Sequence, residues 1–339
     1  MSDSHLLTES VKDFIFDLHD SVRRSQRPAE LKVLYGQTFP ELSQKYYSSE
    51  PWPPASAVAA ECESDELFLA LYDELTFRHM FASLRPTLQD KIDCWGVYES
   101  LFDKLLAVSH GTGGKGLCML PEWAFEIMHE FVYQFQGFCQ LRASAVARGT
   151  EPDDLKLLEE NRGCWAVEKV MKYLHGLVRL SGRNGTAAPG EAHKVLGYFA
   201  ALSLSRLECL LGDFRGSLEA LDGVDLFDKE EMFFPLFPAR LSLFYHAGVS
   251  YFVLRRYRDA ARVMSSMVVA INAGFKTGEL KKLPDFEQFV KLNDRMIALL
   301  AVIYHVQPAI KINEAILRTI NEKHGEKPEI LPASAAEEQ

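Results

Sequence analysis

The sequence predicts an all-α protein, a helical-repeat solenoid of about a dozen helices. Apolar residues recur at helical spacing through nearly the whole chain, and no segment alternates apolar and polar residues as a strand would. A turn pattern also repeats, because LGDFRGSLEAL at 211–221 is matched forty-three positions later by LRRYRDAARVM at 254–264. Helical hairpins that repeat in this way bury their apolar faces by stacking, so the repetition indicates a solenoid.

The first part of the chain opens with one continuous apolar stripe, which predicts a helix. Residues 29–48 give a weaker helix that is interrupted near Pro40, and the stretch PWPP at 51–54 breaks the helical pattern. Ser64 precedes acidic residues and an apolar run, so we expect it to cap a helix over 65–84. The residues of the first stripe are Val11, Phe14, Ile15, Leu18 and Val22.

The remaining elements follow from the same spacing and from glycine-rich loops. The loop HGTGGKG at 110–116 ends one helix, and GRNGTAAPGEA at 182–192 separates an N-terminal helical region, 1–181, from TPR-like repeats at 193–325. The tail at 326–339 has no periodicity, and we expect it to be disordered or a cut end. Helices are predicted at 87–108, 122–147, 164–180, 196–211, 213–222, 239–254, 257–272, 286–305 and 309–323.

Two helical hairpins are predicted in the second half of the chain. In a tetratricopeptide-type hairpin, small residues on the first helix let the second helix lie close, and a short turn joins the two. The degenerate copy at 196–221 and the clearer copy at 239–272 both fit this plan, unless such turns recur by chance between helices. The residues that carry the pattern are Gly212, Asp213, Phe214, Gly248, Tyr251, Tyr257 and Ala260.

Composition limits the functions that the chain can have. A net charge of −10 over 339 residues, with a pI near 5.5, argues against broad binding to nucleic-acid phosphates but not against local basic patches. The six cysteines form no C-x-x-C pair and no zinc spacing, so we expect a reducing, intracellular compartment. The N-terminus does not resemble a signal peptide, and no run of about 18 apolar residues predicts a membrane span.

Two short motifs approach known ligand-binding patterns but lack residues that the chemistry needs. In HGTGGKG, Gly116 follows Lys115 where a phosphate-binding loop has Ser or Thr, and the loop follows a helix. Glu126 and His129 have the spacing of bridging metal ligands, but no second E-x-x-H exists, and Tyr133 replaces the second histidine of a zinc motif. We interpret them as a connector and a surface pair, and we expect no catalytic residue, cofactor or metal.

Charged and aromatic residues provide the candidate contacts of the first half. Arg78 and His79 lie in an apolar helix, where the arginine either anchors a partner or pairs internally with Asp73 or Glu74. Exposed aromatic patches commonly mark interfaces, whereas buried ones belong to the core. Aromatic residues for which both interpretations stand are those at 122–138 and Phe233, Phe234 and Phe237.

The densest basic cluster consists of Arg255, Arg256, Arg258 and Arg262. It suits an acidic partner or an RNA backbone, because guanidinium groups bind carboxylates and phosphates. The alternative is a solvated helix face, with Asp259 offsetting part of the charge.

The segment PWPPASAVAAECESDELFLALYDELTFRHMFASL at 51–84 resembles a signature of the L-subunit family of eukaryotic translation initiation factor 3. In that family a PWP break precedes a helix of the form F-L-x-L-Y-x-E-L, followed by R-H. Collinear matches at 130–140, 194–214 and 247–263 extend the resemblance over about residues 10–325. The signature residues here are Pro51, Trp52, Pro53, Tyr72, Glu74, Arg78 and His79.

The resemblance implies a PCI-type array, in which helical repeats lead into a winged helix, and a cytoplasmic scaffold subunit without catalysis. The partners it implies are the other subunits of translation initiation factor 3 and the small ribosomal subunit, in assembly of the pre-initiation complex and mRNA recruitment, with RNA contact open and no membrane. Family chains continue into the winged helix after about residue 325, whereas this chain ends in PEILPASAAEEQ, so we expect that module to be cut off or lost. The alternatives are a PCI-type subunit of the proteasome lid or signalosome, and an RNA-binding helical-repeat module.

Overall fold

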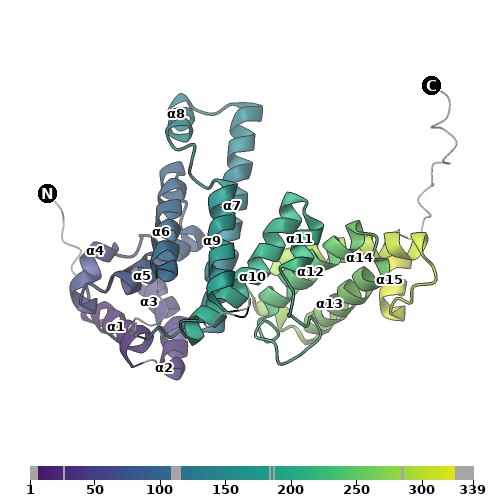
Figure 1. Ribbon diagram of the computed structural model, residues 1–339, viewed down its shortest axis with the longest axis horizontal. Helices are drawn as coiled ribbons and strands as arrows, with labels where there is room; N and C mark the ends of the chain where they lie inside the picture. The colour runs from purple at the N-terminus through teal and green to yellow at the C-terminus, as the bar shows by residue number, and fades with distance from the viewer. Residues whose placement is uncertain are drawn as a thin grey trace. The chain divides into compact units, whose positions relative to one another are not determined.

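The computed structural model of the chain is built of helices (Figure 1). It describes residues 7–25, 27–107, 116–182, 185, 188–283 and 286–324, and within these ranges no strand occurs. The predicted all-α helical-repeat fold is therefore confirmed. The loop HGTGGKG, apart from Gly116, and the tail at 326–339 lie outside the described ranges. Across the helices of those ranges, none combines the length and apolar character needed to cross a membrane.

The chain divides into two compact units, one up to Leu204 and one from Ser205, with the boundary inside helix α10 (Glu191–Leu211). The predicted division into 1–181 and 193–325 stays a prediction, since several residues of the loop between these ranges lie outside the described residues. The first unit contains α1 (Glu9–His19), η1 (Asp20–Arg24), α2 (Pro28–Val33), η2 (Leu34–Thr38), α3 (Phe39–Tyr46), α4 (Ala55–Val58), η3 (Ala59–Cys62), α5 (Glu66–Ser83), α6 (Leu88–Leu106), α7 (Pro121–Arg148), α8 (Pro152–Glu160), α9 (Val167–Leu180) and most of α10.

Helices α1 and α2 both continue into a π-helical turn, η1 and η2 respectively. The predicted stripe of α1 and η1 is buried throughout, with no member more than 2% exposed. The interruption predicted near Pro40 takes the form of η2, which ends just before α3. Pro40 itself is the second residue of α3, which begins directly after the π-helical turn.

The cap of α5 is Asp65, so the expectation that Ser64 caps this helix is wrong. The Oδ1 atom of Asp65 accepts hydrogen bonds from the backbone N–H groups of Leu67 and Phe68, each at 3.1 Å. Ser64 has a φ of 54°, and a residue in the left-handed region does not have the extended backbone of an N-cap. The carboxylate of Asp65, one position later, therefore takes the capping role.

The aromatic residues of α7 belong mainly to the core, so the structure favours the core interpretation of the two that the sequence left open. Phe131 packs against Phe102 at a ring-centroid distance of 4.7 Å and against Trp165 at 5.6 Å. Trp123, Phe131, Phe135 and Phe138 are at most 6% exposed, and Tyr133 is the exposed aromatic residue of this stretch. Helix α7 thus serves as the centre of the first unit. Helix α8, which no periodicity had indicated, follows it.

The second unit contains the end of α10 and a succession of packed helices (Figure 1). Helix α12 packs against α11 and α13, α13 against α14, and α14 against α15. Phe233 is fully buried and Phe237 packs on Phe289 at 5.3 Å, so these two rings fill the core instead of forming a partner surface. The helices are α11 (Phe214–Glu219), α12 (Phe237–Val253), α13 (Tyr257–Thr277), η4 (Leu280–Lys282), α14 (Phe286–Val306) and α15 (Glu314–His324).

Gly197 permits the close approach of α10 to the end of α9. A Cβ atom at this position would lie 2.2 Å from Cβ of Ser181 and 2.6 Å from the carbonyl oxygen of Leu177. We predict that Gly197→Ala lowers the free energy of unfolding by about 1–3 kcal/mol, because backbone and not a flexible side chain must move. Urea denaturation followed by circular dichroism measures this change.

Gly137, in the middle of α7, provides the matched control. A Cβ atom there meets nothing within 4 Å, so Gly137→Ala should raise the free energy of unfolding by about 0.5–1 kcal/mol through helix propensity. If the two substitutions changed the free energy of unfolding equally, the close approach of α9 and α10 would not limit the size of the side chain at position 197.

Candidate functional site

The signature at 51–84 forms an anchor between the proline-rich break and α5. Trp52 is 4% exposed, and its Nε1–H donates to Oγ of Ser43 at 3.0 Å while the ring stacks on Phe39 at 4.9 Å. The Oη–H of Tyr72 donates to the carbonyl oxygen of Pro53 at 2.8 Å. These contacts give the residues of the signature a structural role in holding the N-terminal helices on α5.

An ion cluster lies inside the first unit, around Arg78. The Nε atom of Arg78 is 3.3 Å from Oε1 of Glu74, the i,i+4 pair that the spacing indicates. Nη1 of Arg78 donates to Oη of Tyr35 at 2.6 Å and to a carboxylate oxygen of Glu126. Burial raises the pKa of Glu74 to about 7, although the arginine opposes that shift. Trp123 supplies a further donor to Glu74, at 3.4 Å.

The neighbouring histidines have separate environments. Nε2–H of His79 donates to the carbonyl oxygen of Tyr47 at 3.1 Å, which adds to the anchor. Glu126 contacts Arg78, and His129 packs beside the ring of Phe125 at 5.1 Å. The E-x-x-H spacing therefore places its glutamate in the ion cluster. Among the described residues no group of His, Cys, Asp and Glu is arranged to hold a metal ion.

The two repeat turns have the same backbone conformation. Gly212 has a φ of 88°, and Arg255, forty-three positions later, has a φ of 59°. The N–H of Asp213 donates to the carbonyl of Glu208 at 2.9 Å, and the N–H of Arg256 donates to the carbonyl of Tyr251 at 2.8 Å. The sequence offset therefore corresponds to a repeated helix ending, with a left-handed residue at the same place in each copy.

The helices that follow the two turns also match in register. Ser217 and Ala260 are both fully buried. A Cβ atom on Gly248 would lie 2.8 Å from Cγ of Met264, so this glycine allows α12 and α13 to pack closely. The copies differ at the cap, since Asp213 accepts from the N–H of Gly216 at 2.8 Å while the equivalent arginine cannot accept.

The four predicted arginines are all exposed, and two of them contact other side chains of the protein. Arg256 pairs with Asp259 at 2.8 Å and lies over the ring of Tyr251. Arg262 lies over the ring of Phe227, 4.0 Å from its centroid. The remaining two, Arg255 and Arg258, are exposed. A role for the cluster in binding a partner stays a prediction.

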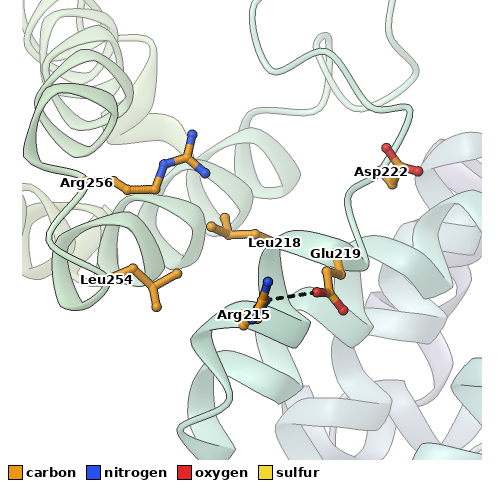
Figure 2. Close-up of a pocket in the computed structure, with 6 residues that line it drawn as sticks. All are labelled: Arg215, Leu218, Glu219, Asp222, Leu254 and Arg256. Atoms are coloured by element: carbon orange, nitrogen blue, oxygen red, sulfur yellow. Dashed lines mark ion pairs between the residues drawn. The ribbon is translucent and has the colours of Figure 1, made fainter.

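A shallow pocket lies between α11 and the turn that joins α12 to α13 (Figure 2). Figure 2 shows Leu218 in the middle, with Arg256 and Leu254 on one side and the Arg215–Glu219 ion pair below. The other lining residue is Asp222. The sequence interpretation missed Arg215, Leu218 and Leu254. Of these, only Leu254 could have been found from the apolar pair that precedes its turn.

Buried hydroxyl groups join the helices beneath this pocket. Oγ of Ser217 on α11 accepts from Ser250 on α12 at 2.9 Å and lies 3.2 Å from Oγ of Ser205 on α10. Nearby, Nδ1–H of His246 donates to the carbonyl of its own helix at 2.7 Å. Burial and the charge of Arg206 lower the pKa of His246 to about 3.

Comparisons with known proteins place this chain among translation-related sequences. Residues 90–338 match the family described as RNA polymerase I-associated factor PAF67. A protein of Nematostella vectensis named eukaryotic translation initiation factor 3 subunit L is 30% identical over 96% of this chain and 63% of its own length. Proteins of the same name from Gallus gallus and Homo sapiens are 31% and 30% identical, each over 87% of this chain and 54% of their own length. The resemblance inferred from the signature is thus confirmed, and the chain spans between 54% and 63% of these relatives.

The ion cluster predicts a large effect of removing its cation alone. Arg78→Met should lower the free energy of unfolding by about 3–5 kcal/mol, because Glu74 is left buried without its counter-charge. The loss should be smaller at pH 5 than at pH 8, since a carboxyl with a raised pKa is protonated at the lower pH. Denaturant titration of both proteins at pH 5 and pH 8 measures this loss in the free energy of unfolding.

A double-mutant cycle controls for lost packing. Glu74→Leu combined with Arg78→Met should be less destabilising than the sum of the two single changes. Additive single effects would contradict an energetic coupling between the two side chains.

His246 predicts a loss of stability in acid. Its pKa is lowered on folding, so the folded state binds fewer protons, and its contribution is complete above the unfolded pKa of 6.5 and declines as the pH falls. Between pH 6.5 and pH 5 the free energy of unfolding should therefore fall by about 1–2 kcal/mol because of His246. The His246→Gln variant should lack this part of the decrease. Thermal denaturation of both proteins across that range tests it, and parallel pH profiles would assign the acid sensitivity to other groups.

Proposed function

Because the chain belongs to the family described as RNA polymerase I-associated factor PAF67, we propose that it is a non-catalytic scaffold subunit of a eukaryotic translation initiation factor 3 complex. The observation that carries this proposal is the match of 87% to 96% of the chain to proteins named as subunit L. The packed helices of both units support it, since helical repeats serve as extended surfaces for protein partners.

The proposed partners are other subunits of that complex and, directly or through them, the small ribosomal subunit, in the cytoplasm. The chain would act by offering a binding surface to its partners. Helices α10 to α13 form hairpins whose turns expose apolar and basic side chains. No chemical step is assigned to the chain. A subunit of the proteasome lid or signalosome is not favoured, because the relatives are named as initiation-factor subunits.

Direct RNA binding through the four arginines receives less support from the geometry. Arg256 and Arg262 are each engaged by side chains of the protein itself, an aspartate and a phenylalanine. Carboxylates of Glu219 and Asp222 also line the adjoining pocket and interrupt the continuous basic groove that a nucleic-acid backbone needs.

Sedimentation of native lysate tests the proposed function. We predict that the tagged chain travels with the small ribosomal subunit or a large multisubunit factor, and that mass spectrometry of those fractions identifies subunits of initiation factor 3. Treatment with ribonuclease distinguishes association through protein from tethering by mRNA. Migration only at the size of the free chain would refute the proposal, and migration with RNA polymerase I would support the description attached to the family.

A further inference from the structure

An exposed surface is repeated at the two hairpin turns, and we call it the turn surface. Two apolar residues precede the left-handed residue in each turn, and they are 42% and 49% exposed in the first turn and 46% and 40% exposed in the second. Basic residues follow them, and side chains from both turn regions line the single pocket of Figure 2. The turn surface consists of Leu210, Leu211, Arg215, Val253, Leu254, Arg255, Arg256 and Arg258.

Arg255 occupies a backbone conformation that an arginine adopts only at a cost. Its φ of 59° is in the left-handed region, where the equivalent position of the first turn has glycine. The side chain is exposed, so the strain is not offset by burial of its stem. The backbone N–H of Arg255 donates to the carbonyl of Phe252, but its side chain has no hydrogen bond or ion pair with a described residue. A strained residue with an exposed side chain supports the hypothesis of a functional position.

The charges of the turn surface are only partly neutralised within the protein. Glu219 pairs with Arg215 at 3.3 Å, and Asp259 pairs with Arg256 at 2.8 Å. Arg255 and Arg258 form no ion pair with any described residue. Basic and acidic residues nearly balance over residues 205–324, so the acidic excess of the chain does not surround this surface.

We infer that the turn surface docks an acidic peptide segment that carries apolar side chains, an inference that rests on the proposed scaffold function and names the chemistry of one partner. The apolar side chains of the peptide pack on the exposed leucines, and its carboxylates pair with Arg255 and Arg258. Asp222 lines the other side of the pocket, so the carboxylates of the peptide are favoured on the arginine side.

A peptide fits this surface better than single-stranded RNA does. Proteins that bind single strands offer aromatic rings on which bases stack, together with a continuous basic groove. The exposed apolar residues here are aliphatic, and Tyr251 is covered by the guanidinium of Arg256 at 4.6 Å. Carboxylates within the pocket interrupt the basic charge.

Fluorescence anisotropy with the full chain tests the inference. The probe is a short labelled peptide of glutamates with two leucines one helical turn apart, and the comparison probes are the same peptide with serines for the leucines and a short oligouridine. We expect Arg255→Gly with Arg258→Ala, and separately Leu211→Ser with Leu254→Ser, to weaken binding of the leucine peptide about tenfold. Arg295→Ala with Val302→Ser, exposed residues of α14, serves as the matched control and should bind as the unaltered chain does.

A stability measurement separates a functional role of Arg255 from a structural one. Arg255→Gly should raise the melting temperature by about 2 °C while it weakens peptide binding, because glycine relieves the strained conformation. Equal peptide affinity in all variants, or tighter binding of oligouridine than of peptide, would overturn the inference. The chain could bind the peptide and yet not sediment with ribosomal subunits. That result would support the docking surface and would contradict only the proposed function.

Discussion

The buried charge of Arg78 constrains the first unit more than any other group in it. A guanidinium that is removed from water must be compensated, and here the compensation comes from three separate elements: Glu74 on α5, Tyr35 on η2 and Glu126 on α7. Each of these elements has to keep its register for the charges to meet. Tyr35 lies within the π-helical turn η2, so the cluster ties this irregular segment to α5 and α7. The tryptophan anchor at the proline-rich break adds a second attachment of the N-terminal segment to α5, through the hydrogen bond of Tyr72 to Pro53.

Sequence periodicity was sufficient to predict the all-α class and most of the helices, because an amphipathic stripe indicates which face of a helix is buried. The stripe of α1 and the long apolar run of α7 are examples in which pattern and burial agree. The pattern could not select Asp65 over Ser64 as the cap, because both residues suit an N-cap and only the left-handed backbone of Ser64 decides between them. Helix α8 escaped notice because it buries only Leu158 and so carries almost no stripe.

For the candidate site, the sequence identified the turns but not their surroundings. The forty-three-residue offset corresponds to equal hydrogen bonds in the two helix endings, which is a strong agreement for a degenerate repeat. Whether an arginine is free depends on neighbours that spacing does not reveal: Phe227 covers Arg262, and it comes from the loop between the hairpins. The aromatic residues were equally ambiguous, because the sequence does not show whether a ring packs in the core or binds a partner. Most rings of α7, and the ring of Phe233, are buried.

The left-handed conformation of Arg255 has a consequence for the history of this chain. Every arginine codon is a single base change away from a glycine codon, so the mutation that would relax the turn arises readily in any population. The first turn, with Gly212, has the relaxed residue at the equivalent position. The proposed docking role therefore implies that related chains keep a basic residue at this position of the second turn, although glycine is accessible and less strained there.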